Sequence, residues 1–151
     1  LGLVKEILLE GAEKGVKFCL PIDVAIAQEP LAGAEIKICK PDGVPDNWKI
    51  FDVGPKTIEV FAVALEGIKT VLWNGPMGIF EIPEFSKGTY QIADVIRSLP
   101  EARTIVGGGS TVEAIAAMGI AGEFSHVSTG GGASLEFLEG KILPGIKPLY
   151  K

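Results

Sequence analysis

Residues 104–112 read Thr-Ile-Val-Gly-Gly-Gly-Ser-Thr-Val, which is a short apolar run, three glycines and the beginning of a segment with helical periodicity. The arrangement occurs twice more, at residues 71–81 (Val-Leu-Trp-Asn-Gly-Pro-Met-Gly-Ile-Phe-Glu) and at residues 126–134 (His-Val-Ser-Thr-Gly-Gly-Gly-Ala-Ser). Apolar runs that alternate with helices of about ten residues predict parallel strands joined by right-handed crossovers. Because strand-to-helix loops in a parallel sheet all lie at its carboxyl edge, we expect the three glycine-rich loops to meet there.

The rest of the chain fits one α/β layer structure, with a sheet that helices cover on both faces. The predicted strands are residues 16–20, 50–53, 70–73, 104–106 and 126–129, with a further extended segment at 23–27. The predicted helices end near Gly15, Gly67, Pro100, Gly119 and Gly140. Residues 28–47 are expected to form an irregular or hairpin-like excursion. The sequence shows no repeat of fixed period and no linker, so a single domain is expected.

The composition excludes several classes of function. The chain has 151 residues, 47% of them hydrophobic, and a net charge of −5. A core of useful size can form at this length, whereas the acidic balance and the lack of a basic run argue against binding nucleic acid. No apolar stretch reaches the roughly 18 residues that span a membrane, and residues 1–15 do not resemble a signal peptide, so we expect a cytoplasmic protein. Neither Cys19 nor Cys39 has the spacing of a metal ligand.

The glycine-rich loops have the chemistry of a phosphate site. Glycine leaves backbone N–H groups uncovered, and a helix that follows adds the positive end of its dipole, so three such loops at one edge predict a polyphosphate site. The glycines at 107–109 also fit an ordinary turn in which Ser110 or Thr111 caps the helix instead of binding phosphate. The chain contains neither the P-loop pattern nor the dinucleotide pattern of spaced glycines, so the loops must bind by a different arrangement.

The loop at residues 74–81 carries groups that suit the rest of a nucleotide. Glu81 would repel phosphate, but it could accept hydrogen bonds from both hydroxyls of a ribose. Glu81 could equally be an ordinary acidic residue in a solvated loop. Pro76, Met77 and Ile79 offer apolar surface to a flat base, or else serve ordinary packing. The residues alone leave both interpretations open at each position.

Residues 71–81 closely resemble the nucleotide-site signature of the phosphoglycerate kinase family. The loop at 107–109 and residues 125–136 are similar to the next two signatures of that family, in the same order. Residues 20–24, 52–55 and 138–145 also match, so the resemblance extends over nearly the whole chain. It implies that residues 1–151 are the later part of the C-terminal, nucleotide-binding domain, an incomplete Rossmann-like three-layer α/β sandwich on a parallel sheet.

The resemblance also implies an activity and a set of site residues. The family transfers a phosphoryl group between ATP and 3-phosphoglycerate in glycolysis, with ATP or ADP and Mg²⁺ in the site. The implied nucleotide-binding residues are, from the base to the phosphates, Phe51, Pro76, Ile79, Glu81, Asn74, Gly108, Gly109, Ser110 and Thr111. The amides of Gly130, Gly131 and Gly132 would receive the transferring phosphoryl group. That role suits a reaction that needs positioning and charge stabilisation more than covalent chemistry.

Two departures from the family pattern stand out. The family has Asp at the position of Ser110, where it helps to hold the nucleotide-bound magnesium, and a hydroxyl is a weaker partner for this hard cation. No residue is therefore assigned as a metal ligand. The basic N-terminal domain that binds 3-phosphoglycerate has no counterpart here, and the only arginines are Arg97 and Arg103. Together with a start that lacks Met, these features predict a piece of a longer, monomeric enzyme that is inactive by itself.

Two rival functions remain open from the sequence. The first is a non-catalytic adenine-nucleotide-binding module that works without a partner domain. The second is a dinucleotide oxidoreductase domain, which the missing glycine fingerprint disfavours.

Overall fold

The structure is a computed structural model and describes residues 2–150. The helices are α1 (Gly2–Glu13), α2 (Pro55–Leu65), α3 (Lys87–Arg97), α4 (Gly109–Ala117) and α5 (Gly131–Leu138). The strands are β1 (Val24–Ala27), β2 (Lys37–Cys39), β3 (Lys49–Val53), β4 (Thr70–Asn74), β5 (Arg103–Gly107) and β6 (His126–Ser128). Short 3₁₀ turns occur at η1 (Pro41–Gly43), η2 (Pro83–Phe85), η3 (Ala121–Glu123) and η4 (Lys147–Leu149).

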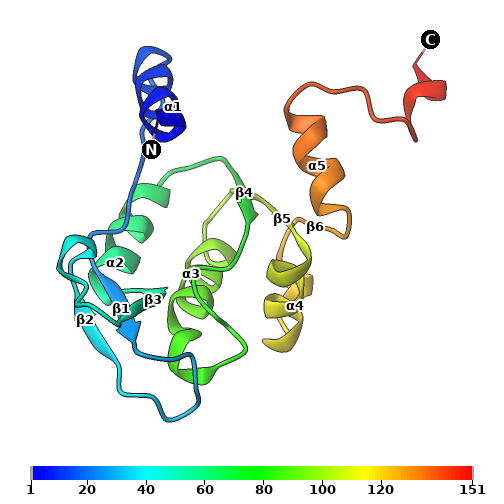
Figure 1. Cartoon of the computed structure of the whole chain (residues 1–151). Helices are drawn as coiled ribbons and strands as arrows, with labels where there is room; N and C mark the ends of the chain where they lie inside the picture. Colours follow the sequence, from blue (N-terminus) through cyan, green and yellow to red (C-terminus); the bar gives the residue numbers. More distant parts are fainter. Residues whose placement is uncertain (1, 151) are drawn as a thin grey trace.

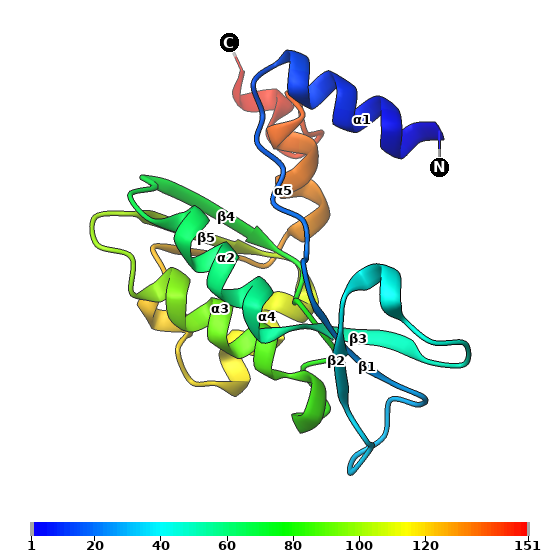
Figure 2. The same cartoon turned by 90° about the vertical axis from the view of Figure 1, so that its left-hand side faces the viewer.

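The centre of the fold is a parallel sheet with the strand order β4-β5-β6. Each strand is followed by a helix, so the alternation predicted from the sequence is confirmed. Helices α2, α3 and α4 cover one face of this sheet (Figures 1 and 2). Alternation along β4 places Val71 and Trp73 in that core beside Ile92 and Ile115. The α/β class with a parallel sheet is therefore as expected.

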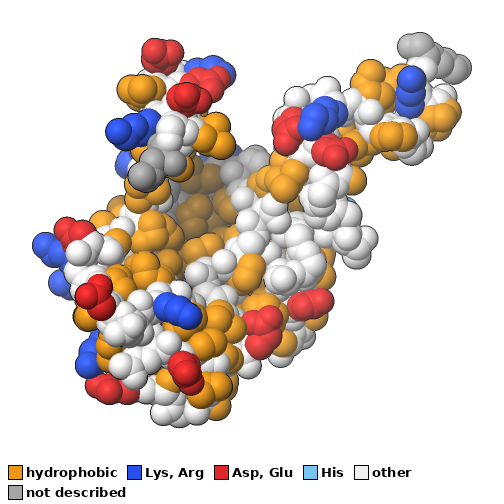
Figure 3. All heavy atoms as spheres, viewed as in Figure 1, with side chains coloured by type: hydrophobic (Ala, Val, Ile, Leu, Met, Phe, Trp, Pro, Cys, Tyr) orange, Lys and Arg blue, Asp and Glu red, His pale blue; other side chains and the backbone are white. Residues whose placement is uncertain are grey.

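The opposite face of the parallel sheet is only partly covered. Leu72 points away from the core and is 40% exposed, and it lines a hollow with Ile105 and Phe137 of α5. Figure 3 shows hydrophobic side chains in the hollow between α1 and α5, which both extend from the same end of the body. Among the described residues, the expectation of helices on both faces therefore holds for one face, and the sandwich is incomplete.

The N-terminal part of the chain forms a second sheet that is antiparallel. Its order is β2-β1-β3, with Ala25 opposite both Ile38 and Asp52, and its register shifts between Ala25 and Ile26. The central strand β1 is buried along its whole length. Strand β2 lies within residues 28–47, where the sequence predicted an irregular or hairpin-like excursion. The sequence did not distinguish this sheet from the parallel one, because short strands look alike whichever way they pair.

The strand predicted at residues 16–20 is wrong. The segment forms no strand, and Val16, Phe18 and Leu20 are 53%, 41% and 61% exposed. It is an extended connection between α1 and β1, and Phe18 packs against Gly11 of the helix. An apolar run becomes a strand only where a neighbour accepts its hydrogen bonds, and no described strand pairs with this one. In residues 2–150, no helix combines the length and apolar character needed to cross a bilayer.

Candidate functional site

The three glycine-rich loops lie side by side at the carboxyl edge of the parallel sheet. In the register, Asn74 at the end of β4 is the partner of Gly107, and Gly107 is the partner of Ser128 at the end of β6. The loops that follow these three residues therefore leave the sheet from adjacent positions. The expected meeting of the loops at one edge is confirmed.

The loops contact one another through their backbones, and this requires glycine. Gly108 has a φ of 88°, and a Cβ at this residue would collide with Oδ1 of Asn74. A Cβ on Gly131 would lie 2.7 Å from Cα and 2.9 Å from N of Gly108. Carbon atoms normally approach to about 3.5–4.0 Å, so neither residue can carry a side chain without moving its neighbour. Asn74, Gly108 and Gly131 thus form one continuous surface from three separate loops.

Two helices begin on this surface. Helix α4 begins at Gly109 and α5 at Gly131, and neither has a side-chain cap or an acidic residue in its first turn. The N–H groups of a first helical turn have no acceptor within the helix, so those of Gly109, Ser110 and Gly132 are available to an anion. Ser110 and Gly132 are also exposed. The edge consequently offers hydrogen-bond donors and positive helix ends, which is the chemistry of a phosphate site.

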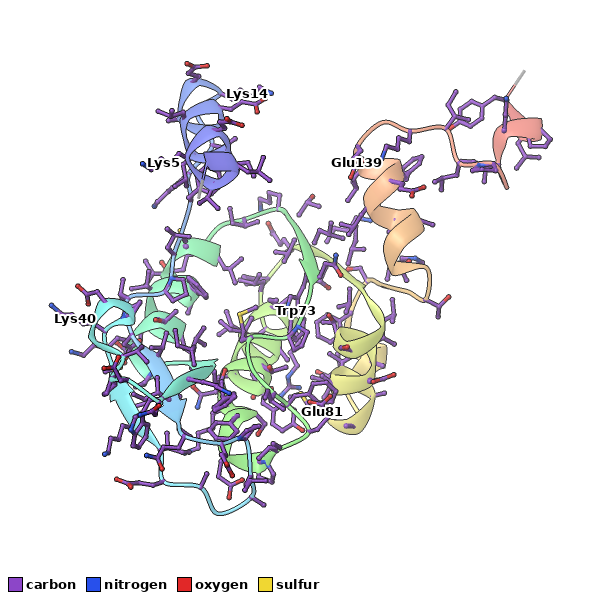
Figure 4. All side chains as sticks on the ribbon, in the orientation of Figure 1. Lys5, Lys14, Lys40, Trp73, Glu81 and Glu139 are labelled. Carbon is purple, nitrogen blue, oxygen red and sulfur yellow. The ribbon has the colours of Figure 1, made fainter. Side chains whose placement is uncertain are left out.

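Thr111 holds two of the loops together. Its side chain is fully buried, and its hydroxyl oxygen accepts a hydrogen bond of 2.7 Å from the N–H of Gly75. On the other side, Nε1 of Trp73 donates to the carbonyl oxygen of Gly75 at 2.8 Å. Figure 4 shows Trp73 in the middle of the body, beside this loop. The hydroxyl of Thr111 is therefore engaged inside the protein, where it joins the first turn of α4 to the loop that follows β4.

An apolar pocket of about 620 Å³ adjoins the same loop. Three of the residues predicted to contact a base line this pocket, namely Phe51, Pro76 and Ile79. The remaining lining residues are Leu20, Pro21, Val24, Pro41, Ile50, Asp52, Val53, Met77 and Gly78. Residues 75–79 form one loop that is bonded to Thr111 at its first residue and borders the pocket with the rest. The pocket and the donor-rich edge are thus neighbours, with a size in the range of ligand sites.

Glu81 lies farther along the loop that follows β4. In the chain it follows the pocket-lining residue Ile79 and precedes η2. Its side chain is exposed and it does not line the apolar pocket. No group of three or more His, Cys, Asp or Glu side chains within residues 2–150 is arranged to hold a metal ion.

The arginines of the chain are remote from the donor-rich edge. Arg103 is the first residue of β5, whereas Gly107 at the edge is the last. Arg97 is at the end of α3, where it pairs with Asp94 at 2.7 Å and with Glu123 at 2.6 Å. These two carboxylates raise the pKa of Arg97 above its usual value. The phosphate-binding capacity of the edge therefore comes from backbone amides and not from guanidinium groups.

Two buried aspartates anchor the site, and sequence reasoning assigned neither a role. Asp52 is 2% exposed and accepts hydrogen bonds from the N–H groups of Gly88 at 2.7 Å and Val53 at 2.8 Å. Burial raises the pKa of Asp52, and these two hydrogen bonds offset only part of that effect. An aspartate inside an otherwise apolar strand was the signal that could have identified it.

Asp23 likewise accepts backbone N–H groups, at the beginning of α2. Its carboxylate accepts hydrogen bonds from the N–H groups of Thr57 at 2.7 Å and Lys56 at 3.1 Å, and Gly54 leaves the space in which it fits. Burial by itself would raise the pKa of Asp23, but the hydrogen bonds from Thr57 and Lys56 outweigh it and lower the pKa. Pro55 is the first residue of α2, as the sequence predicted.

The chain is similar in sequence to known proteins. The family model for phosphoglycerate kinase matches residues 1–141. The chain is 51% identical over 150 residues to the phosphoglycerate kinase of Pseudothermotoga lettingae and 52% identical over 149 residues to that of Thermosipho africanus. It spans 99% and 97% of its own length in these alignments, but only 38% and 37% of the length of the relatives.

Solved structures of phosphoglycerate kinases are also similar to this chain. The structure of phosphoglycerate kinase from Coxiella burnetii superposes with a TM-score of 0.91 at 44% identity, covering 98% of this chain and 38% of that one. Phosphoglycerate kinase from Pyrococcus horikoshii superposes with a TM-score of 0.73 at 29% identity, covering 97% and 38%. The chain is thus similar in both sequence and fold to about two fifths of each of these proteins.

Proposed function

The chain belongs to the phosphoglycerate kinase family, and from this premise we propose that it is the nucleotide-binding part of an enzyme that transfers a phosphoryl group between ATP and 3-phosphoglycerate. One observation carries the proposal. A donor-rich edge built from Asn74, Gly108 and Gly131 is joined by a single loop to an apolar pocket of about 620 Å³. A nucleotide has the matching form, with an anionic chain at one end and a flat apolar base at the other.

In this proposal, the base occupies the pocket formed by Phe51, Pro76 and Ile79. Glu81 accepts hydrogen bonds from the ribose hydroxyls, and Asn74 lies near the phosphates. The amides of Gly108, Gly109, Ser110 and Thr111 bind the phosphate chain at the beginning of α4. The amides of Gly130, Gly131 and Gly132 at the beginning of α5 stabilise the negative charge on the phosphoryl group in transit.

Magnesium fits this edge only as an ion that the nucleotide brings with it. Mg²⁺ in phosphoryl-transfer sites is bound by one or two protein oxygen ligands together with substrate phosphates. The exposed hydroxyl of Ser110 can supply one oxygen, and the first turns of α4 and α5 contain no carboxylate. Bound in this way, the ion would neutralise charge on the phosphates, while the backbone amides hold the oxygens that it leaves free.

The second substrate requires residues outside this chain. We propose that 3-phosphoglycerate is bound by an N-terminal domain, that the chain is a segment of the C-terminal domain, and that the complete enzyme is a cytoplasmic monomer. The chain by itself should then show no turnover, because this reaction needs both substrates aligned in a closed cleft that excludes water. A coupled assay with ATP and 3-phosphoglycerate tests this expectation, and turnover near that of a full-length relative would contradict it.

A non-catalytic nucleotide-binding module is the second candidate. The observation that favours it is the distance of Arg97 and Arg103 from the donor-rich edge, since a phosphoryl-transfer site usually adds a cationic side chain. The mass of the native protein separates the two candidates. A species about two and a half times as long as this chain supports the enzyme, and a species of this length supports the module. Calorimetric titration with ADP tests the feature that both share, and no measurable binding would reject both.

A further inference from the structure

We propose that Asp52 and Thr89 are positioning residues that hold the base-binding loop, residues 76–79, in the shape of the apolar pocket. The inference rests on the proposed function, because it assigns these residues to the adenine end of a nucleotide site. Neither side chain is part of the donor-rich edge, so their effect on a ligand should be confined to its base.

The carboxylate of Asp52 lies directly beneath the loop. A Cβ added to Gly78 would be 2.5 Å from Cγ of Asp52 and 2.5 Å from the carbonyl oxygen of Phe85. The loop thus rests against the carboxylate so closely that only glycine fits at this residue. The same carboxylate accepts the N–H of Gly88 in the first turn of α3 and the N–H of Val53 in β3. Asp52 therefore bonds to a helix and a strand and packs against the loop at the same point.

Thr89 fixes the loop from the side of α3. Its side chain is fully buried, and its hydroxyl oxygen accepts hydrogen bonds from the N–H groups of Met77 at 3.0 Å and Gly78 at 3.2 Å. The next amide along the loop, that of Ile79, donates to the carbonyl oxygen of Phe51 at 3.1 Å. Three successive backbone amides of the loop are therefore bound to groups of the scaffold. Pro76 and Ile79 of this loop line the pocket together with Phe51.

Burying the carboxylate of Asp52 costs free energy, and capping α3 alone would not require this burial. Its carboxyl group is buried between β3, α3 and the loop, and burial of a charge is unfavourable unless donors surround it. The raised pKa of Asp52 records that cost, which its two amide donors only partly offset. Asp23 shows the alternative, since it caps α2 through the N–H groups of Lys56 and Thr57 and has a lowered pKa. Asp23 is therefore a matched control for the loss of a buried capping aspartate.

The experiment compares two ligands that share phosphates and differ in the base. Binding of ADP and of inorganic tripolyphosphate to the chain is measured by calorimetry for the wild type, Asp52→Asn and Asp23→Asn. We expect Asp52→Asn to weaken ADP roughly 10- to 100-fold, as follows from leaving a buried donor without its partner. The affinity for tripolyphosphate should change by less than about twofold, because the protein amides that would bind it lie in a separate part of the site. Asp23→Asn should leave the ratio of the two affinities unchanged.

A second pair of variants decides the outcome if Asp52→Asn fails to fold. Thr89→Val removes the acceptor for the amides of Met77 and Gly78, whereas Thr89→Ser keeps the hydroxyl. Selective loss of ADP binding in Thr89→Val, with recovery in Thr89→Ser, supports the positioning role. Equal loss of both ligands, or unchanged ADP affinity in both Asp52→Asn and Thr89→Val, overturns it. A wild-type chain that binds neither ligand instead overturns the proposed function from which the inference starts.

Discussion

Replacing Gly131 with alanine should damage the phosphate edge, even though alanine favours helices. The new Cβ would lie 2.7 Å from Cα of Gly108, which is roughly 1 Å closer than carbon atoms normally approach. The position of a Cβ is fixed by its own backbone, and Cα of Gly108 is itself a backbone atom, so no side-chain rotation can relieve the contact. We expect the beginnings of α4 and α5 to be forced apart by a similar distance.

The magnitude follows from the hydrogen bonds that such a displacement breaks. A hydrogen bond between a backbone amide and a charged phosphate contributes about 1.5–3 kcal/mol. Loss of one of them corresponds to a decrease in ADP affinity of roughly 10- to 100-fold. Calorimetric titration of the chain with ADP measures this change directly.

Gly132 provides the matched control for this experiment. A Cβ at Gly132 meets no atom within 4 Å, and the residue is exposed in the first turn of α5. Alanine there retains the backbone N–H through which Gly132 is proposed to act, so ADP affinity should stay within about twofold of the wild type. It should also protect the amides of α5 from hydrogen exchange, because it favours the helix by roughly 0.5–1 kcal/mol. If Gly131→Ala binds ADP as tightly as Gly132→Ala, the close contact between the loops does not shape the site.

Three further predictions address single side chains. Glu81→Ala should weaken ADP by roughly 1–3 kcal/mol and a 2′,3′-dideoxy analogue far less; equal losses for the two nucleotides would remove Glu81 from the ribose site. Ser110→Asp should strengthen binding of MgADP but not of free ADP, because a carboxylate attracts the cation and repels phosphate; an unchanged magnesium dependence in titrations would leave Ser110 as a helix residue without a role in metal binding. The pKa of Asp23 is lowered from its ordinary value of 3.8 by hydrogen bonds from Thr57 and Lys56 that outweigh burial, so its stabilisation is present above pH 3.8 and is lost as the pH falls through the lowered pKa. Asp23→Asn should therefore be less stable than the wild type at neutral pH and should lose less stability on acidification. Urea unfolding at several pH values measures this difference. If the free energies of unfolding of the two proteins change in parallel with pH, the assignment is wrong.

The parallel sheet was predictable because its signals are local. Each of its strands is a short apolar run that ends in glycine and is followed by a helix, as in Val71 to Gly75 or Thr104 to Gly109. Such a pattern determines strand direction, since a crossover helix returns the chain to the same end of the sheet. The meeting of Asn74, Gly107 and Ser128 at one edge follows from that direction alone.

The antiparallel sheet was not predictable, because its pairing depends on distant residues. Ala25 is opposite both Ile38 and Asp52, and nothing in residues 23–27 specifies either partner. The wrong prediction of a strand at residues 16–20 has the same cause. Val16 to Leu20 is apolar apart from Lys17, but only β1 lies between two strands that complete its hydrogen bonds. Local pattern identifies segments able to form strands, and tertiary contacts select those that do.

The predicted site residues divide according to how they act on a ligand. Gly108, Gly109 and Gly131 present backbone amides, so their contribution depends on where the backbone lies. That position is set by buried side chains: Thr111 binds the amide of Gly75, and Asp52 lies beneath Gly78. A site made of amides should therefore tolerate an added methyl group at an exposed position such as Gly132 and respond sharply to change at buried positions. Its sensitivity to mutation should follow burial more closely than distance from the phosphates, because the buried side chains hold the donors in place.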